Sequence, residues 1–112
     1  MIVSRYRCFL VGYNWIIGPP VQELTGFFDT RAEIVNWYGI LPGQIFVISD
    51  LDVRTLNQLI GSRFPQGFFI VAQLDPNATD GWLPEEAWNF INQPQPSLAE
   101  SLTRNLLKTS SR

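Results

Sequence analysis

The hydrophobic residues of this chain fall into short unbroken runs, and the clearest arrangement lies between residues 43 and 75. Residues 45–48 and 68–72 are apolar throughout, as in strands that are covered on both faces. The residues between them can place apolar side chains on one helical face, at Leu51, Leu56, Leu59 and Ile60. This spacing predicts strand, helix, strand, and a connection of this length predicts that the two strands are parallel neighbours.

Polar and small residues mark the expected ends of this central helix. Ser49 suits the N-cap position, and Asp52 stands three residues later as the acidic partner of a near capping box. Gly61 suits the position after the last helical turn, because glycine adopts a positive φ at little cost. Pro65 and Gly67 then turn the chain into the second strand.

A similar pattern precedes the central unit. Residues 2–13 contain a strand whose buried part is residues 8–11, and a Thr-x-x-Glu capping box at residues 30–33 predicts a helix that ends at Gly39. The chain thus reads as two overlapping strand–helix–strand units. Glycine and proline interrupt residues 12–28 repeatedly, so the apolar residues there either fold back on the core or are covered by a partner chain.

Beyond the central unit, a helix is expected to start near Pro84, because proline fits the first helical turn. A second capping box opens residues 97–112, where Leu98, Leu102 and Leu106 recur every four residues. We expect an α/β domain in residues 1–92, a Pro/Gln linker in residues 93–96, and a C-terminal amphipathic helix and tail in residues 97–112.

The expected fold class is α/β, with a three- to four-stranded, mainly parallel sheet flanked by helices. An α+β sandwich of the ferredoxin-like kind is the alternative, because it uses the same kinds of element in a different pairing.

Composition excludes several classes of function. The chain of 112 residues is 46% hydrophobic and has a net charge of −2, which argues against broad electrostatic binding to nucleic acid or to membranes. It has no histidine, and Cys8 is the single cysteine and lies in an apolar run. With no apolar stretch of membrane-spanning length and no signal-peptide pattern, a cytoplasmic location is the default expectation.

Carboxylates follow both strands of the central unit. In a parallel sheet, Asp50, Asp52 and Asp75 would meet at the carboxyl ends of the strands, where oxygen ligands could hold Mg²⁺. Residues 45–52, an apolar strand ending in Asp-x-Asp, resemble the first motif of haloacid-dehalogenase-type phosphatases. The resemblance implies Asp50 as a nucleophile, Asp52 as a general acid/base and Mg²⁺ as a cofactor for phosphoryl transfer.

The chain departs from that family after the motif. Val53 and Arg54 stand where the family has a Gly-Thr turn, and the only lysine of the chain is Lys108 in the tail. The alternative is that the same Asp-x-Asp sequence arises because acidic residues cap a helix directly after a strand, with no catalytic role.

Other residues suggest binding rather than catalysis. Trp15 and Trp82 lie in or beside loops, where aromatic side chains contribute strongly to protein interfaces. Arg5, Tyr6 and Arg7 could form a small basic–aromatic platform for nucleic acid, or could be the solvated start of an edge strand.

The C-terminal segment adds a charge argument. Residues 97–112 carry +2 and residues 1–92 carry −4, so the tail is complementary to the body of its own or a second copy. The leading hypothesis is a small intracellular non-catalytic domain that binds protein and forms homo-oligomers through Trp15, Trp82 and the leucines at 98, 102 and 106. The Mg²⁺-dependent phosphoryl-transfer enzyme and the nucleic-acid binder are the alternatives.

Overall fold

The computed structural model of the protein describes residues 5–14 and 16–97. In chain order its elements are β1 (Arg7–Tyr13), α1 (Val21–Thr30), β2 (Ile34–Leu41), β3 (Gln44–Ser49), α2 (Val53–Arg63), β4 (Phe69–Gln73), the short 3-10 helix η1 (Pro76–Ala78) and α3 (Glu85–Asn92). The central strand, helix and strand around residues 44–73 are therefore present in the predicted order.

The strands form one sheet in the order β2-β3-β1-β4, and every neighbouring pair is antiparallel. The predicted mainly parallel α/β sheet is wrong. β3 and β4 do run in the same direction, but β1 lies between them and pairs with both. The fold is α+β, and its β-α-β-β-α-β order of strands and longer helices is consistent with the ferredoxin-like alternative.

Sequence patterns failed here because a crossover helix fixes the direction of two strands and not the number of strands between them. β1 is apolar on both faces, with Phe9 fully buried on one side and Cys8 buried on the other. A strand of this kind is stabilised most in the middle of a sheet, because both its faces are then buried and both its edges are hydrogen-bonded.

The helix predicted to begin at residue 30 is also wrong. That segment is β2, and the helix α1 lies before it, in a stretch where repeated glycine and proline residues had argued against regular structure. Ile34 and Val35 begin β2 and suit a pleated strand. The chain then turns at Gly43, where φ is +75°, and returns as β3.

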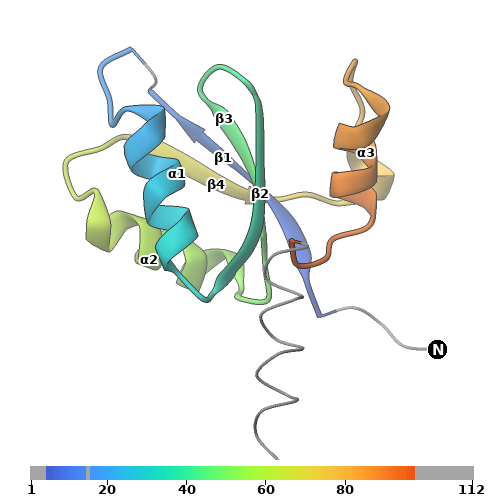
Figure 1. The fold of residues 1–112 in the computed structure, drawn as a ribbon, viewed down its shortest axis with the longest axis horizontal. Coiled ribbons are helices and arrows are strands. Elements are labelled where there is room, and N and C mark those ends of the chain that lie inside the picture. Colours follow the sequence, from blue (N-terminus) through green and yellow to red (C-terminus); the bar gives the residue numbers. More distant parts are fainter. Residues whose placement is uncertain (1–4, 15, 98–112) are drawn as a thin grey trace, which may run out of the picture.

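Helices α1 and α2 cover one face of the sheet (Figure 1). Their apolar stripes meet the inward residues of β1 and β3 in the main core, which consists of Phe9, Val11, Leu24, Phe28, Ile34, Ile45, Val47, Leu56, Ile60 and Phe64. Side chains of this kind each contribute about 1.5–3 kcal/mol when they are fully buried.

Helix α3 lies on the opposite side of the sheet (Figure 1). Its Ile91 packs with Cys8 and Phe46 in a second, smaller core cluster. The phenol of Tyr38 on β2 donates a hydrogen bond to the Glu86 carboxylate on α3, with 2.9 Å between the oxygens. This bond and the small cluster hold α3 against the end of the sheet where β1 begins.

The turn between β3 and α2 differs in detail from the prediction. Ser49 is buried and its hydroxyl donates to the backbone oxygen of Glu33, so it ties β3 to β2 and does not cap the helix. The N-cap is Asp52, and Gly61 lies inside α2, which continues to Arg63.

The predicted linker lies beside β2. The backbone N–H of Ser97 donates to the Val35 oxygen at 2.9 Å, and the Asn36 side chain donates to the backbone oxygen of Gln95 at 3.4 Å. Residues 98–112, with most of the predicted C-terminal helix, are outside the described residues. Among the helices that are described, none is both long and apolar enough to cross a membrane.

We expect Ile91→Ala to lower the free energy of unfolding by about 2–5 kcal/mol, because the side chain is 1% exposed and its removal leaves a cavity. Trp82→Ala, in the loop before α3, should change stability by no more than about 0.5 kcal/mol, because Trp82 is fully exposed. Urea unfolding followed by circular dichroism measures both variants. Equal losses in the two would contradict the packing of α3 described here.

Candidate functional site

The predicted acidic residues lie where β3 and β4 end. Both strands finish at the same end of the sheet because both are antiparallel to β1. The chain that leads into β1 enters between them, and Arg5 Nε lies 3.7 Å from Asp50 Oδ2. Asp50 and Asp75 therefore follow strands that are separated by β1, whereas the sequence predicted that these strands would be neighbours.

Asp52 has a structural role in this arrangement. Its Oδ1 accepts a hydrogen bond from the backbone N–H of Thr55 at 2.7 Å, which satisfies one of the free donors at the start of α2. This bond lowers the pKa of the Asp52 carboxyl below its ordinary value of 3.8. A carboxylate held this way at a helix start stabilises the helix in its charged form.

Asp75 caps the short helix η1 in the same way, with Oδ1 accepting from the Asn77 N–H at 2.9 Å. Across residues 5–14 and 16–97, no three acidic or cysteine side chains gather closely enough to hold a metal ion. The Mg²⁺ site at Asp50, Asp52 and Asp75 stays a prediction, as does the phosphoryl-transfer activity derived from it.

The basic–aromatic residues lie at the same end of the sheet. The Arg5 guanidinium lies 5.2 Å from the centre of the Tyr6 ring and donates to the Tyr6 hydroxyl at 3.2 Å. Arg7 is exposed at the first position of β1. A cation and an aromatic ring are thus adjacent, but Arg5 also faces the acidic Asp50, which reduces its attraction for a phosphate.

The predicted partner-binding residues are only partly described. Trp82 is fully exposed, with a relative accessibility of 101%. Trp15 and the leucines at 98, 102 and 106 lie outside the described residues. Trp37 on β2 and Trp88 on α3 are partly buried against the two core clusters.

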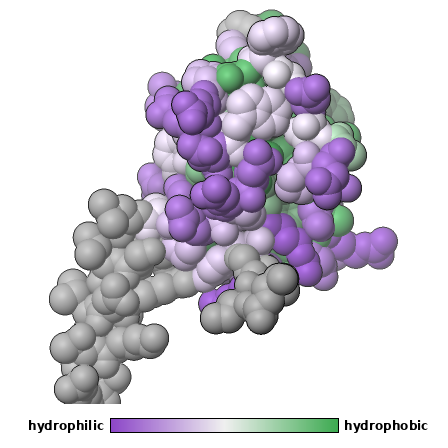
Figure 2. Space-filling model, turned by 90° about the vertical axis from the view of Figure 1, so that its right-hand side faces the viewer, coloured by the Kyte–Doolittle hydropathy of each residue, from purple (hydrophilic) through white to green (hydrophobic). Residues whose placement is uncertain are grey.

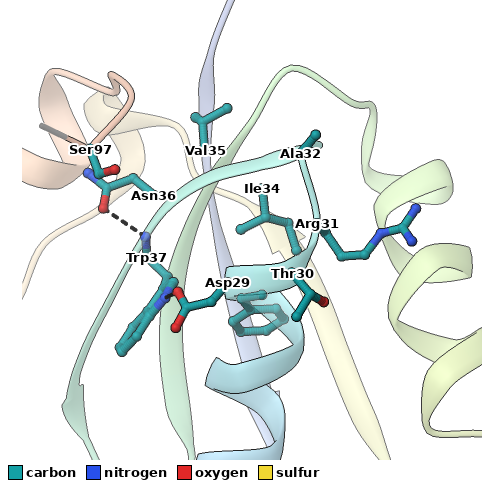
Figure 3. A pocket seen from close by; sticks show the side chains of 10 residues that line it. Asp29, Thr30, Arg31, Ala32, Ile34, Val35, Asn36, Trp37 and Ser97 are labelled. Carbon is teal, nitrogen blue, oxygen red and sulfur yellow. Dashed lines mark hydrogen bonds between the residues drawn. The ribbon is translucent and has the colours of Figure 1, made fainter. Parts of the chain in front are cut away.

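A polar hollow of about 320 Å³ lies between the end of α1 and the start of β2 (Figure 3). On one side the Trp37 indole N–H donates to Asp29 Oδ1 at 2.7 Å. Arg31 extends away from this pair and forms two hydrogen bonds with Glu33, at 2.9 and 3.2 Å. These bonds lower the pKa of Glu33.

The opposite end of the sheet is apolar and exposed. It is formed by the loop after β1, the start of α1, the β2–β3 turn and the loop before β4 (Figure 1). We call this surface the apolar end and define it by its exposed hydrophobic residues: Ile16, Ile17, Val21, Ile40, Leu41, Phe68 and Ile70. Among residues 5–14 and 16–97, the exposed large hydrophobic residues all belong to it except Val53 and Trp82.

Two hollows open on the apolar end and share Pro20. One, of about 630 Å³, lies between the start of α1 and the β2–β3 turn and includes Tyr13, Trp37 and Ile40. The other, of about 370 Å³, lies between Ile17 and the loop before β4. The two loops are in close contact, because a Cβ on Gly67 would lie 3.5 Å from Pro19 Cδ. The apolar end is therefore one continuous, grooved surface.

The sequence pattern pointed to only one part of this surface, the apolar residues between 12 and 28 that a partner chain could cover, although a wider signal was present. Residues 8–22, 34–49 and 64–74 contain no charged residue, and the antiparallel topology brings the middle of all three stretches to one end of the sheet. By contrast, the side of the molecule that carries α3 is mainly hydrophilic (Figure 2).

The two described groups with a raised pKa, Cys8 and Tyr38, lie with the second core cluster and not at the apolar end. Cys8 is buried on the other face, and desolvation by burial raises the pKa of its thiol to about 12. Desolvation and the neighbouring Glu86 carboxylate raise the pKa of Tyr38, which serves to hold α3. The surface can exclude water from an apolar partner, which is a binding property.

Comparisons of this chain with protein-family models, with curated proteins and with solved structures found no match.

Substitution of Asp52 tests its role as a helix cap. Asp52→Ala should destabilise the protein at pH 7, whereas Asp52→Asn should retain most of the stability because asparagine is an equally good N-cap. The lowered pKa of Asp52 adds stability above about pH 3.8, which is lost as the pH falls through the pKa of the folded state. The advantage of wild type over Asp52→Asn should therefore shrink between pH 7 and pH 3 in urea unfolding. A pH-independent difference would argue against this role.

The Cys8 thiol should be unreactive in the folded protein, because a pKa of about 12 leaves almost no thiolate at pH 8. Ellman's reagent should react slowly in native buffer and fully in 6 M guanidinium chloride. A Trp82→Cys variant supplies an exposed control thiol, which should react rapidly while Cys8 does not. Rapid reaction of wild type in native buffer would show that Cys8 is accessible.

Proposed function

We propose that this chain is a non-catalytic domain that acts by binding protein, and that a second copy of the chain is one of its partners. The observation that carries the proposal is the apolar end. Monomeric proteins rarely expose contiguous apolar patches beyond a few hundred Å², and larger ones usually mark interaction sites.

The exposed side chains of this patch are large. Ile16, Ile17 and Phe68 are 77%, 86% and 84% exposed. Transfer of apolar surface from water contributes about 25 cal/mol per Å², so covering these side chains would strongly favour association. The loops that carry them contact each other, so a partner would meet a formed surface and would lose little entropy in ordering it.

The low charge of the patch limits the kind of partner. Anionic membranes and nucleic acids are attracted by clusters of basic residues, whereas the residues that line the two hollows include a single basic one, Arg63. An apolar protein surface fits it best, because neither partner then has to bury an unpaired charge.

The distribution of catalytic residue types supports a binding role. The chain has no histidine. The Asp52 carboxylate is engaged by α2 and Asp50 faces Arg5. Both carboxylates also lie at the opposite end of the sheet from the apolar end.

The proposal can be tested by sedimentation equilibrium between low micromolar and high micromolar concentrations. Wild type should show an average mass above the 12.8 kDa of one chain, and this mass should fall on dilution. A variant with Ile16→Ser, Ile17→Ser and Phe68→Ser should stay monomeric, because it removes the most exposed apolar area. Trp82→Ser is the matched control, since it removes an exposed aromatic residue elsewhere and should associate like wild type.

A monomeric wild type over the whole concentration range would overturn the self-association part of the proposal. A shortened chain that ends at Ser97 keeps the Ser97–Val35 hydrogen bond and shows whether residues 98–112 contribute. An unchanged mass for this shortened chain would assign association to the folded body, and a loss of association would assign it to the tail.

A further inference from the structure

The sheet has two edge strands, β2 and β4, which differ in how far their outer edges are covered and how regular their pairing is. The outer edge of β2 is partly covered, because Ser97 donates its N–H to the Val35 oxygen. The pairing of β2 with β3 is also interrupted by irregularities near Ile34 and Tyr38. Covering an edge and bulging it are two ways in which proteins keep edge strands from pairing with other chains.

β4 shows neither feature. Its register with β1 is continuous from Phe69 to Gln73. In the part of the chain that the structure describes, no backbone hydrogen bond other than those of the β1–β4 ladder involves β4. Residues 64–74 also lack charged side chains, and β4 has no proline, so the usual protections of an edge strand are missing here.

The register identifies which backbone groups of β4 face outward. The N–H of Leu74 donates to the Cys8 oxygen at 2.9 Å, and hydrogen-bonded pairs alternate along an antiparallel ladder. Ile70, Ala72 and Leu74 therefore direct their N–H and C=O groups to β1. Phe69 and the alternate residues Val71 and Gln73 direct theirs away from the sheet.

We propose that β4 pairs antiparallel with β4 of a second copy, so that the two sheets join into one sheet of eight strands, four from each copy. This inference rests on the proposed function and adds the backbone edge of β4 to the surface that self-association uses, beside the apolar end to which Phe68 and Ile70 belong. A two-fold axis beside Val71 lets all the outward groups of both strands pair, because Phe69 then lies opposite Gln73 of the second copy.

A second copy fits this edge because of its charge and shape. In an interface with two-fold symmetry, each residue near the axis meets its own mate, so a charge there would repel itself. β4 carries none. In the proposed register Ile70, which is 69% exposed, lies opposite the small exposed Ala72 of the second copy, so a large side chain meets a small one on the open face.

The expected contact is of modest size. Five residues of β4 span about 17 Å, and an aromatic residue such as Phe68 buries on the order of 150–250 Å². A stable interface needs about 800 Å² per partner. Helix α2 packs beside β4, so the two α2 helices would approach each other and add area. We expect a dimer that dissociates on dilution.

Residue-resolved amide hydrogen exchange measured at two protein concentrations tests this geometry. The amides of Ile70 and Ala72 should be protected at both concentrations, because they bond to β1. The amides of Val71 and Gln73 should be protected only at the concentration at which the protein associates. Protection of these amides that does not depend on concentration would show that the chain covers its own edge, which would overturn the proposal.

Gln73→Pro provides the matching variant. It removes an outward N–H from an exposed position and leaves the N–H groups of Ala72 and Leu74 on β1. Gln73→Ala is the control, because it keeps the backbone N–H. We expect Gln73→Pro to weaken association on the order of tenfold or more and Gln73→Ala to associate like wild type. Retained protection of the Ile70 amide in Gln73→Pro confirms that the sheet is intact.

The outcomes separate the two proposals. Association of wild type and Gln73→Pro to the same extent would overturn pairing through β4 and leave self-association standing. A wild type that is monomeric at every concentration would overturn both.

Discussion

The structure depends on the hydrogen bonding of β1 along both of its edges. Its odd-numbered residues bond to β3, as in the Tyr13 N–H to Gly43 oxygen bond, and its even-numbered residues bond to β4, as in the Cys8–Leu74 pair. Because β1 is antiparallel to both neighbours, the two apolar strands of the central unit run the same way without touching. This single placement separates Asp50 from Asp75 and brings Arg5 beside Asp50.

The local elements with strong hydrophobic periodicity could be predicted from the sequence. The strands near residues 46 and 70, the helix between them and the helix after Pro84 all lie where the sequence predicts them. The run near residue 70 was wrongly predicted to be covered on both faces, because β4 is an edge strand in which Ile70 is 69% exposed. The pairing of the strands could not be predicted, because the sequence pattern of a fully covered strand does not depend on the direction of its neighbours. β2 was mistaken for a helix because residues 30–33, just before it, match a capping box. In the structure these side chains make other hydrogen bonds: the Thr30 hydroxyl donates to the Phe27 backbone oxygen, and Arg31 donates to the Glu33 carboxylate.

The candidate surface was harder to predict than the strands, since it depends on topology. Ile17 and Phe68 are far apart in the sequence and belong to loops with few distinguishing residues. Only the antiparallel arrangement brings these loops to one end. The carboxylates were easy to notice in the sequence, because an Asp-x-Asp pair after a strand is a pattern of neighbouring residues and does not depend on topology. In the structure, Asp52 of that pair caps α2 through the Thr55 N–H.

The hydrogen bond from Ser97 to Val35 holds the end of the described chain beside β2. That point lies at β2, at the far edge of the sheet from β4. If two copies join through β4, their Ser97 residues lie at opposite margins of an eight-stranded sheet, separated by seven strand spacings or roughly 34 Å. The assembly would then present two equivalent β2 margins that face away from each other.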